Sequence, residues 1–128
     1  MGDTPQMKHH IGTDIIEIAR IKEAVARWGE RFLNRVYTGQ ELELYRQDVP
    51  TLAAYFAGKE AVIKALGPQN KRIGWREIEI LRQRGGKPYV NLYGEAQNQA
   101  ERLGLNNLDI SLSHSREYAI AAVIGATE

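Results

Sequence analysis

The chain has 128 residues, of which 43% are hydrophobic and 26% are charged, and its formal net charge is +1. These values are typical of one soluble globular domain with a core of its own. The sequence has no cysteine and no apolar run near the roughly 20 residues of a membrane-spanning helix, so disulfide, thiolate and membrane-embedded functions are excluded. No basic-then-apolar signal peptide opens the chain, and we expect a cytoplasmic protein.

The first residues are polar and show no periodicity. We expect a disordered or expression-derived terminus over residues 1–9, followed by a single domain over residues 10–128. The domain opens with a strand over residues 10–18 that is rich in β-branched residues, and its Gly12 allows another backbone to approach closely. Asp14 stands among apolar neighbours on this strand. Local sequence alone favours Asp14 as the N-cap of the following helix over a functional role.

From Ile18 the hydrophobic period becomes helical. Three arginines of this segment, Arg20, Arg27 and Arg31, recur at spacings of seven and four residues, away from the apolar positions. A solvated helix face is the ordinary explanation, although arginines with so few carboxylates among them could also bind an acidic partner helix. The apolar stripe that should pack inward consists of Ile18, Ile21, Val25, Trp28 and Phe32.

Local signals mark two further helices. Thr38 and Glu41 have the spacing of a capping box and predict a short helix through Tyr45. Pro50 stands at a first-turn position that tolerates proline, and it begins a longer helix that ends at Gly67.

Glu60 interrupts the apolar face of this longer helix. At about 100° per residue, its side chain falls on the same arc as Leu52, Phe56 and Ile63. An unpaired buried carboxylate is costly, so such a group normally pairs, takes up a proton or binds a metal. An ion pair with Lys64, four residues further on, explains Glu60 equally well from the helix alone.

The second half of the chain has mostly β-strand periodicity. Strands around Ile78–Ile80 and Val90–Leu92 have more apolar face than two or three helices would cover, and we expect burial against copies of the chain. The predicted elements are a strand over 75–82, a turn over 84–88, a strand over 89–93, a helix over 94–103, and a strand pair over 109–115 and 118–124.

Asp14 and Glu60 together indicate metal chemistry. Two carboxylates from separate elements, with phosphate oxygens and waters, are a normal arrangement for magnesium. Between Lys59 and Lys87 there are eight basic residues and three acidic ones, so the region around Glu60 suits a polyanionic ligand. With three histidines, two of them adjacent, a zinc site is improbable, and any metal should be bound by oxygen ligands.

Five short segments form an ordered set along the chain. They are Ile-Gly-Thr-Asp over 11–14, Phe-Ala-Gly-Lys-Glu-Ala-Val-Ile-Lys-Ala over 56–65, Trp-Arg-Glu-Ile-Glu over 75–79, Gly-Lys-Pro over 86–88 and Leu-Ser-His-Ser over 112–115. In this order and at this spacing, the set resembles the holo-acyl-carrier-protein synthases, a family of 4′-phosphopantetheinyl transferases. The resemblance covers residues 11–125 and implies an α+β phosphopantetheinyl transferase fold, with an antiparallel sheet packed against helices, assembled as a homotrimer with sites between subunits.

The resemblance also implies an activity. It is the magnesium-dependent transfer of 4′-phosphopantetheine from coenzyme A to a serine of an apo acyl carrier protein, in fatty acid biosynthesis. Adenosine 3′,5′-bisphosphate is the other product. The serine proton would be accepted by Glu60, a magnesium-bound water or His114, with Glu60 or its water favoured.

Site residues follow from the resemblance position by position. Asp14 and Glu60 would be the magnesium ligands, and Arg20, Arg27 and Arg31 would dock the acidic carrier protein. Tyr55 departs from the family, whose members often have a basic residue there. The catalytic residues would be Glu60, Lys64 and His114, and the coenzyme A ligands would be Lys59, Lys64, Gly67, Lys87, Pro88 and His114.

Two other classes of function remain open at this stage. A different enzyme of nucleotides or diphosphates could use the same carboxylates, although the sequence has no Walker loop and no GxGxxG fingerprint. A small nucleic-acid-binding module would explain the arginines but not Glu60 on an apolar arc. Basicity in such modules usually covers a whole face or domain, and here it does not.

Overall fold

Helices and strands follow one another in an α+β order, as predicted. The computed structural model describes residues 8–67 and 72–127. Its elements are β1 (Lys8–Glu17), α1 (Ile18–Trp28), α2 (Glu30–Val36), α3 (Gly39–Tyr45), α4 (Val49–Leu66), a 3₁₀ turn η1 (Trp75–Glu77), β2 (Ile78–Arg82), β3 (Pro88–Leu92), α5 (Gly94–Leu103), β4 (Leu108–His114) and β5 (Tyr118–Thr127).

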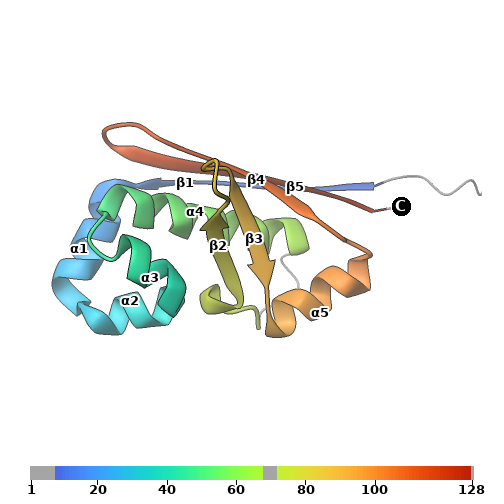
Figure 1. Cartoon of the computed structure of the whole chain (residues 1–128), viewed down its shortest axis with the longest axis horizontal. Helices are drawn as coiled ribbons and strands as arrows, with labels where there is room; N and C mark the ends of the chain where they lie inside the picture. Colours follow the sequence, from blue (N-terminus) through green and yellow to red (C-terminus); the bar gives the residue numbers. More distant parts are fainter. Residues whose placement is uncertain (1–7, 68–71, 128) are drawn as a thin grey trace, which may run out of the picture.

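The first sheet has three antiparallel strands in the order β1-β5-β4. Buried and exposed residues alternate without exception along β5, which gives the sheet one covered face and one open face. Figure 1 shows this sheet as a long layer with the helices beneath it. Helix α4 packs along the covered face, and small side chains on the helix allow the close approach: Ala53, Ala54, Ala57 and Ala61.

Gly12 is where strand and helix come closest. A Cβ atom built on Gly12 would lie 1.8 Å from the carbonyl oxygen of Ala61, so no side chain can be accommodated there. The sequence-based expectation for Gly12 is therefore correct. Because side chains alternate along a strand, Asp14 lies on the same face of β1 as Gly12 and points toward α4.

A β2–β3 hairpin forms the second sheet, with Ile78 opposite Leu92. The observed strand β2 begins at Ile78, three residues after the predicted start, because residues 75–77 form the 3₁₀ turn η1. Ile78 and Ile80 are fully buried inside the chain. At Ile78 and Ile80 the expectation of an open apolar face is therefore wrong, whereas Val90 and Leu92 on β3 are half-buried in the single chain.

The open apolar face lies instead on β1 and β5. Ile11 and Ile15 on β1 are 63% and 59% exposed, and Ile120 and Ile124 on β5 are 47% and 44% exposed. In the strand register Ile11 lies opposite Ile124 and Ile15 lies opposite Ile120, so the four side chains form two cross-strand pairs on one face, with the pair Thr13–Ala122 between them.

The predicted helix from Ile18 is two helices. Gly29 has φ 55°, a left-handed value that glycine adopts without strain, and it separates α1 from α2. The predicted stripe is therefore discontinuous: Ile18 and Ile21 are buried, whereas Trp28 is 50% exposed.

The cap signals were read correctly. The Thr38 hydroxyl accepts a hydrogen bond from the Glu41 amide, and the Glu41 side chain accepts one from the Thr38 amide, which is a complete capping box. Helix α4 begins at Val49 with Asp48 as its N-cap, and Gly67 follows its last residue. Within the two described stretches, no helix has the length and apolarity needed to cross a membrane.

Candidate functional site

The contact between β1 and α4 pairs two of the predicted site residues, Asp14 and Lys64, and a third lies one helical turn away. Lys64 Nζ donates hydrogen bonds to Asp14 Oδ1 at 3.1 Å and to the Thr13 carbonyl at 2.9 Å. Glu60 lies one helical turn before Lys64 and next to Ala61, the residue that Gly12 touches. Two carboxylates from different elements and one ammonium group thus line one stretch of the β1–α4 contact.

Two alternatives from the sequence are excluded by these contacts. Asp14 lies inside β1, and the N-cap position of α1 is occupied by Glu17, so Asp14 does not cap that helix. Lys64 pairs with Asp14, and no ion pair between Glu60 and Lys64 is formed.

Each carboxylate has one oxygen held by the protein. Asp14 Oδ1 accepts from Lys64, and Glu60 Oε2 accepts from the indole Nε1 of Trp75 at 2.7 Å. The other oxygens, Asp14 Oδ2 and Glu60 Oε1, accept no hydrogen bond from any residue that the structure describes. A hard divalent cation prefers such oxygen ligands and takes only one or two carboxylates when phosphate is also present, so the donor set fits magnesium. No group of three or more potential metal-binding side chains occurs in residues 8–67 and 72–127, which does not favour a metal bound by the protein alone.

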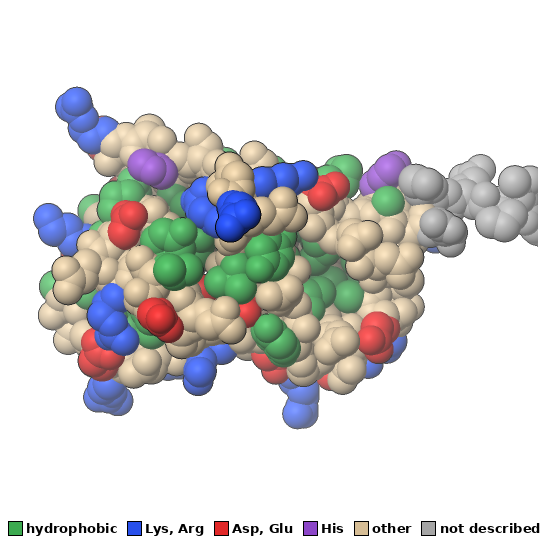
Figure 2. Space-filling view, viewed as in Figure 1, with side chains coloured by type: hydrophobic (Ala, Val, Ile, Leu, Met, Phe, Trp, Pro, Cys, Tyr) green, Lys and Arg blue, Asp and Glu red, His purple; other side chains and the backbone are tan. Residues whose placement is uncertain are grey.

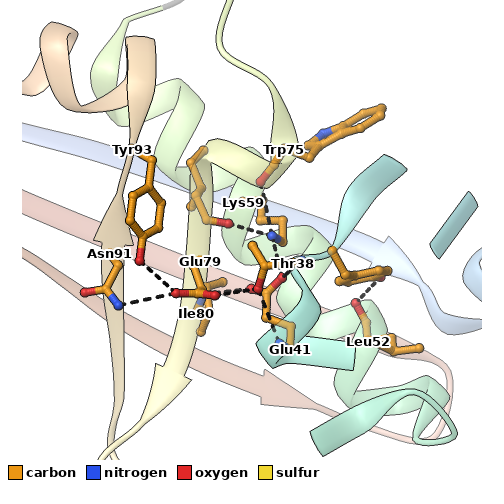
Figure 3. Close-up of polar contacts among 11 residues, drawn as sticks. Thr38, Glu41, Leu52, Lys59, Trp75, Glu79, Ile80, Asn91 and Tyr93 are labelled. Atoms are coloured by element: carbon orange, nitrogen blue, oxygen red, sulfur yellow. Dashed lines mark hydrogen bonds and ion pairs between the residues drawn. The ribbon is translucent and has the colours of Figure 1, made fainter. Parts of the chain in front are cut away.

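Lys59 is placed differently from the sequence-based expectation. Its side chain is fully buried, and Nζ donates to Glu41 Oε1 at 2.8 Å, to the Ile78 carbonyl at 2.5 Å and to the Trp75 carbonyl at 3.1 Å (Figure 3). With its hydrogen-bonding capacity used in the interior, Lys59 is not available to a ligand at the surface, and the geometry gives it a structural role.

The surroundings of Lys59 are strongly polar for a protein interior. Burial lowers the pKa of the Lys59 ammonium, and the charge and hydrogen bond of Glu41 partly offset this effect. Glu41 Oε2 also accepts from the Ile80 amide at 2.7 Å. Glu79, on the neighbouring strand position, accepts from Thr38 Oγ1 at 2.5 Å and from the Tyr93 hydroxyl at 3.0 Å. This network ties α3, α4 and the hairpin together and was not predicted.

Tyr37 lies beside this network. Its hydroxyl donates to the Leu52 carbonyl at 2.6 Å, and Lys59 Nζ lies 5.6 Å from the centre of its ring. Burial raises the pKa of the Tyr37 hydroxyl well above its usual range, and the nearby Glu41 carboxylate acts in the same direction.

Tyr55, which replaces the basic residue common in the family, points inward. It is fully buried, and its ring packs edge-on against Tyr45 with centroids 5.3 Å apart. Arg82 Nε donates to the Tyr55 hydroxyl at 3.3 Å, so a basic side chain from the hairpin lies at this position. Burial raises the pKa of Tyr55 to about 12, against the opposing effect of Arg82.

His114 lies at the end of β4 and is exposed. In the strand register, His114 lies opposite Ala119 of β5, which in turn lies opposite Ile16 of β1. Asp14 lies two positions before Ile16 on β1, opposite Ala121. At strand spacings of about 4.8 Å, His114 is therefore two strands away from Asp14. It shares a sheet face with Asp14 but is not part of the carboxylate cluster.

The hairpin lies beside β4, at the edge of the three-stranded sheet. Lys87 and Pro88 line a cavity of about 550 Å³ together with Ile11 and Ile124 of the open face. In the space-filling view, basic side chains gather at the hairpin tip, above a patch of hydrophobic side chains (Figure 2). Within one chain, the structure does not bring Lys87 and Pro88 to Asp14 and Glu60. Gly67, with φ 111°, ends α4 one turn beyond Lys64.

The arginines lie on two helices. Arg20 and Arg27 belong to α1, but the break at Gly29 places Arg31 on α2, so helical spacing does not put all three on one face. Arg31 nevertheless lines a groove of about 630 Å³. The other residues of this groove are Trp28, Phe32, Arg35 and Trp75.

Comparison with known proteins decides the family. The model of the 4′-phosphopantetheinyl transferase superfamily matches residues 10–123. The chain belongs to this superfamily. It is accordingly a transferase, and the resemblance seen in its motifs is confirmed.

The family member of Dehalococcoides mccartyi, a holo-[acyl-carrier-protein] synthase, is 58% identical over 116 residues, which are 90% of this chain and 96% of that protein. The holo-[acyl-carrier-protein] synthase of Herpetosiphon aurantiacus is 48% identical over 121 residues, 89% of this chain and 95% of that protein.

Solved structures of the family have the same fold. The Helicobacter pylori holo-[acyl-carrier-protein] synthase in complex with coenzyme A matches with a TM-score of 0.81 at 33% identity, covering 90% of this chain and 98% of that one. The Bacillus anthracis protein, in complex with CoA (3′,5′-ADP), matches with a TM-score of 0.78 at 28% identity, covering 96% of this chain and 100% of that one.

Sequence reasoning missed two features of the site. Trp75 was part of a motif but was given no role. The sequence signal that could have identified it is an indole donor between a glycine and an arginine, just before a strand. The burial of Lys59 had a clearer signal, since Ala57, Gly58, Ala61 and Val62 surround it with small or apolar residues on the same helix.

Proposed function

We propose that this chain transfers the 4′-phosphopantetheine group of coenzyme A to a serine of an apo acyl carrier protein, with a carrier of fatty acid biosynthesis as the acceptor. The observation that supports this proposal is the Lys64–Asp14 pair, one helical turn from Glu60, at the close approach of Gly12 to Ala61. Relatives of 58% and 48% identity that are named holo-[acyl-carrier-protein] synthase support it, as does the coenzyme A complex of the H. pylori protein.

Magnesium would be held by the free oxygens of Asp14 and Glu60, with phosphate oxygens of coenzyme A completing its ligands. When bound, it supplies positive charge that neutralises the pyrophosphate as the bond to the leaving group breaks. The Lys64 ammonium, 55% exposed at its side chain, contributes a second positive charge on the same side of α4.

The reaction is a displacement at the β-phosphorus of coenzyme A. The serine hydroxyl oxygen of the carrier forms a new bond to this phosphorus, and the bond from phosphorus to the oxygen of the α-phosphate breaks. Adenosine 3′,5′-bisphosphate leaves with that oxygen. The serine proton must be accepted near the phosphorus, and we favour Glu60 over His114 because His114 lies two strands away from the carboxylate cluster.

A site shared between subunits explains the position of the hairpin. Within one chain, Lys87 and Pro88 line a cavity with Ile11 and Ile124 of the open face, whereas Asp14 and Glu60 lie at the β1–α4 contact, yet both groups are proposed to serve the coenzyme A site. Association of the open faces of neighbouring chains in a homotrimer would let the hairpin of one copy complete the site of another. The apolar residues Ile11, Ile15, Ile120 and Ile124 suit such an interface.

Mass spectrometry tests the proposed reaction. Apo acyl carrier protein incubated with the enzyme, coenzyme A and magnesium should gain the mass of one phosphopantetheine group on its serine. Removal of magnesium with a chelator should abolish the gain. Asp14→Asn and Glu60→Gln should each reduce it nearly to background, because an amide keeps the shape of the side chain but loses its charge.

The alternative classes give different results. Unmodified carrier protein together with saturable binding of ATP rather than coenzyme A would favour another nucleotide enzyme. Magnesium-independent binding to nucleic acid with a steep salt dependence would favour a basic binding module. Normal transfer by Asp14→Asn or Glu60→Gln at moderate magnesium would exclude the proposed ligand pair.

A further inference from the structure

We infer that Trp75 is a positioning residue that fixes the Glu60 carboxylate in the orientation in which its free oxygen binds magnesium. The inference rests on the proposed function, since it assumes that Glu60 is a metal ligand. It assigns to Trp75 a role that none of the motifs described above required.

The hydrogen bond itself is short and charge-assisted. Trp75 Nε1 donates to Glu60 Oε2 at 2.7 Å, and hydrogen bonds from a neutral N–H to a carboxylate are stronger than neutral pairs. The indole has one N–H and no acceptor, so it can hold one oxygen and leaves the other to a metal. Donors of this kind commonly orient metal-binding carboxylates.

The tryptophan is itself held in place at three points. Its ring packs against Phe56, with centroids 5.5 Å apart, and Phe56 lies one turn before Glu60 on α4. Its carbonyl accepts a hydrogen bond from the buried Lys59 Nζ at 3.1 Å. Its backbone belongs to the 3₁₀ turn η1, whose Glu77 amide donates to the Gly74 carbonyl. In Figure 3 the Trp75 carbonyl points to Lys59 while the indole ring extends away from the polar network.

The two proposed ligands are therefore held in the same way. Asp14 is fixed through one oxygen by Lys64, and Glu60 is fixed through one oxygen by Trp75. Glutamate has three side-chain torsions, and an unrestrained carboxylate must lose this freedom when it binds a metal. A donor that orders Glu60 beforehand lowers that entropic cost and raises the affinity for the metal.

Trp75→Phe tests the inference because phenylalanine retains a ring against Phe56 and removes the N–H. Loss of an outer-shell partner should weaken metal binding by about tenfold. We expect this loss in a Mn²⁺ titration of the protein saturated with coenzyme A, followed by the electron paramagnetic resonance of free Mn²⁺, and in the magnesium concentration that gives half-maximal transfer. The KM for coenzyme A at saturating magnesium should stay unchanged, a separation that general damage to the fold would not produce.

A spectroscopic measurement on the metal-free wild-type protein supplies an independent readout. The chain has two tryptophans, so its ¹⁵N-labelled indole region contains two resonances, and Trp28→Phe identifies the one that belongs to Trp75. That resonance should lie far downfield and move upfield in Glu60→Ala. It should also shift when Mg²⁺ is added to the protein already saturated with coenzyme A. This readout decides the question even if Trp75→Phe does not fold.

The outcomes separate the inference from the proposed function. Wild-type metal affinity in a folded Trp75→Phe, or an indole resonance that Glu60→Ala leaves unmoved, would overturn the role of Trp75 while leaving the magnesium pair intact. Normal metal binding and transfer by Glu60→Gln would instead exclude Glu60 as a magnesium ligand, and with it the role of Trp75. The proposed function fails separately, if the wild-type protein leaves the apo carrier protein unmodified.

Discussion

Lys59 and Lys64 show how two lysines of the same helix can have opposite roles. The Lys59 side chain is fully buried and bonds to Glu41 and two carbonyl groups, whereas the Lys64 side chain is 55% exposed and bonds to Asp14 at the edge of the candidate site. Five positions correspond to about 140° of rotation around the helix, which places one lysine toward the hairpin and the other toward β1.

Substitution of each lysine by methionine should separate these roles. Lys59→Met leaves the Glu41 carboxylate buried and unpaired, so the free energy of unfolding should fall by about 3–5 kcal/mol. Lys64→Met removes an exposed pair worth at most about 1 kcal/mol and should leave stability nearly unchanged while transfer falls sharply. Urea unfolding and the transfer assay, applied to both variants, check the prediction.

The opposite pattern would contradict this interpretation. If Lys59→Met were as stable as the wild type and inactive, Lys59 would act on the substrate. Its buried ammonium group would then have to become accessible during the reaction. If Lys64→Met lost stability, its pair with Asp14 would be structural.

Tyr37 predicts how stability depends on pH in the alkaline range. An unfolded tyrosine loses its proton near pH 10.0, whereas burial raises the pKa of folded Tyr37, so the folded state keeps a proton that the unfolded state releases. The contribution of Tyr37 to stability is therefore complete below pH 10 and is lost above it, by up to about 1.4 kcal/mol per pH unit.

Tyr37→Phe is the variant that isolates this effect. It removes the hydrogen bond to the Leu52 carbonyl, at a cost of about 1 kcal/mol near neutral pH. Above pH 10 its stability should fall less steeply than that of the wild type, so the two curves of urea midpoint against pH should converge. The lowered pKa of Lys59 acts in the opposite direction below pH 10.5, but it is common to both proteins. Parallel curves would show that Tyr37 ionises normally in the folded state.

At the scale of elements, α1 and α2 form the surface that we expect to bind the carrier protein. Arg20 and Arg27 lie on α1, and Arg31 lines the groove with Trp28 and Trp75. Arg27 also lies over the Trp28 ring, with the guanidinium carbon 5.1 Å from the ring centre. A groove with aromatic walls and a basic rim suits an acidic partner that inserts an apolar side chain.

Charge reversal of Arg20 and Arg27 tests this surface. Exposed charges mainly accelerate encounter and are screened by salt. Arg20→Glu with Arg27→Glu should therefore raise the KM for carrier protein strongly, leave the KM for coenzyme A nearly unchanged and flatten the salt dependence of the rate. Steady-state kinetics at several salt concentrations measure all three quantities.

A matched double reversal on another element controls for net charge. Arg84 and Arg116 are exposed arginines in the turns β2–β3 and β4–β5, and neither belongs to α1 or α2. Arg84→Glu with Arg116→Glu changes the net charge by the same amount. An equal rise in the KM for carrier protein in this control would mean that long-range charge, and not the face of α1, is responsible.

Elements whose ends depend on local signals were predictable from the sequence. The Thr38–Glu41 capping box, the helix that ends at Gly104 and the hairpin turn all depend on contacts within a few residues. The break at Gly29 was missed because one glycine inside a helical period is compatible with a continuous helix. The alternation over Trp75–Glu77 continues that of β2 and predicts a strand, whereas the 3₁₀ turn found there is set by tertiary contacts of Trp75 with Phe56 and Lys59.

The site was predictable only in part for the same reason. Asp14 and Glu60 could be singled out because a carboxylate among apolar residues is unusual on any element. Which lysine faces the site could not be derived, because Lys59 and Lys64 both flank Glu60 in the sequence and only the position of the hairpin decides between them. The partner of Glu60, fifteen positions away at Trp75, is a tertiary contact.

At the scale of the whole molecule, the single chain leaves one face of its three-stranded sheet uncovered. Two cross-strand pairs of isoleucine lie on that face, and monomeric proteins rarely leave such contiguous apolar surface in water. The same face borders the cavity that Lys87 and Pro88 line. An interface there would both bury the isoleucines and bring the hairpin of one copy toward another.

Ile15→Glu with Ile120→Glu should therefore dissociate the proposed homotrimer. The two side chains are directly opposite each other and exposed in the single chain, so the substitution places two like charges in the interface without disturbing the core. Light scattering should report a trimer for the wild type and a monomer for the variant, with unchanged far-ultraviolet circular dichroism. Transfer should be lost, because each site would lack the hairpin of its neighbour.

Leu44→Glu, at a position that is 63% exposed on α3, is the matched control and should remain trimeric and active. A wild-type protein that is monomeric and fully active at working concentration would refute both the trimer and the shared site.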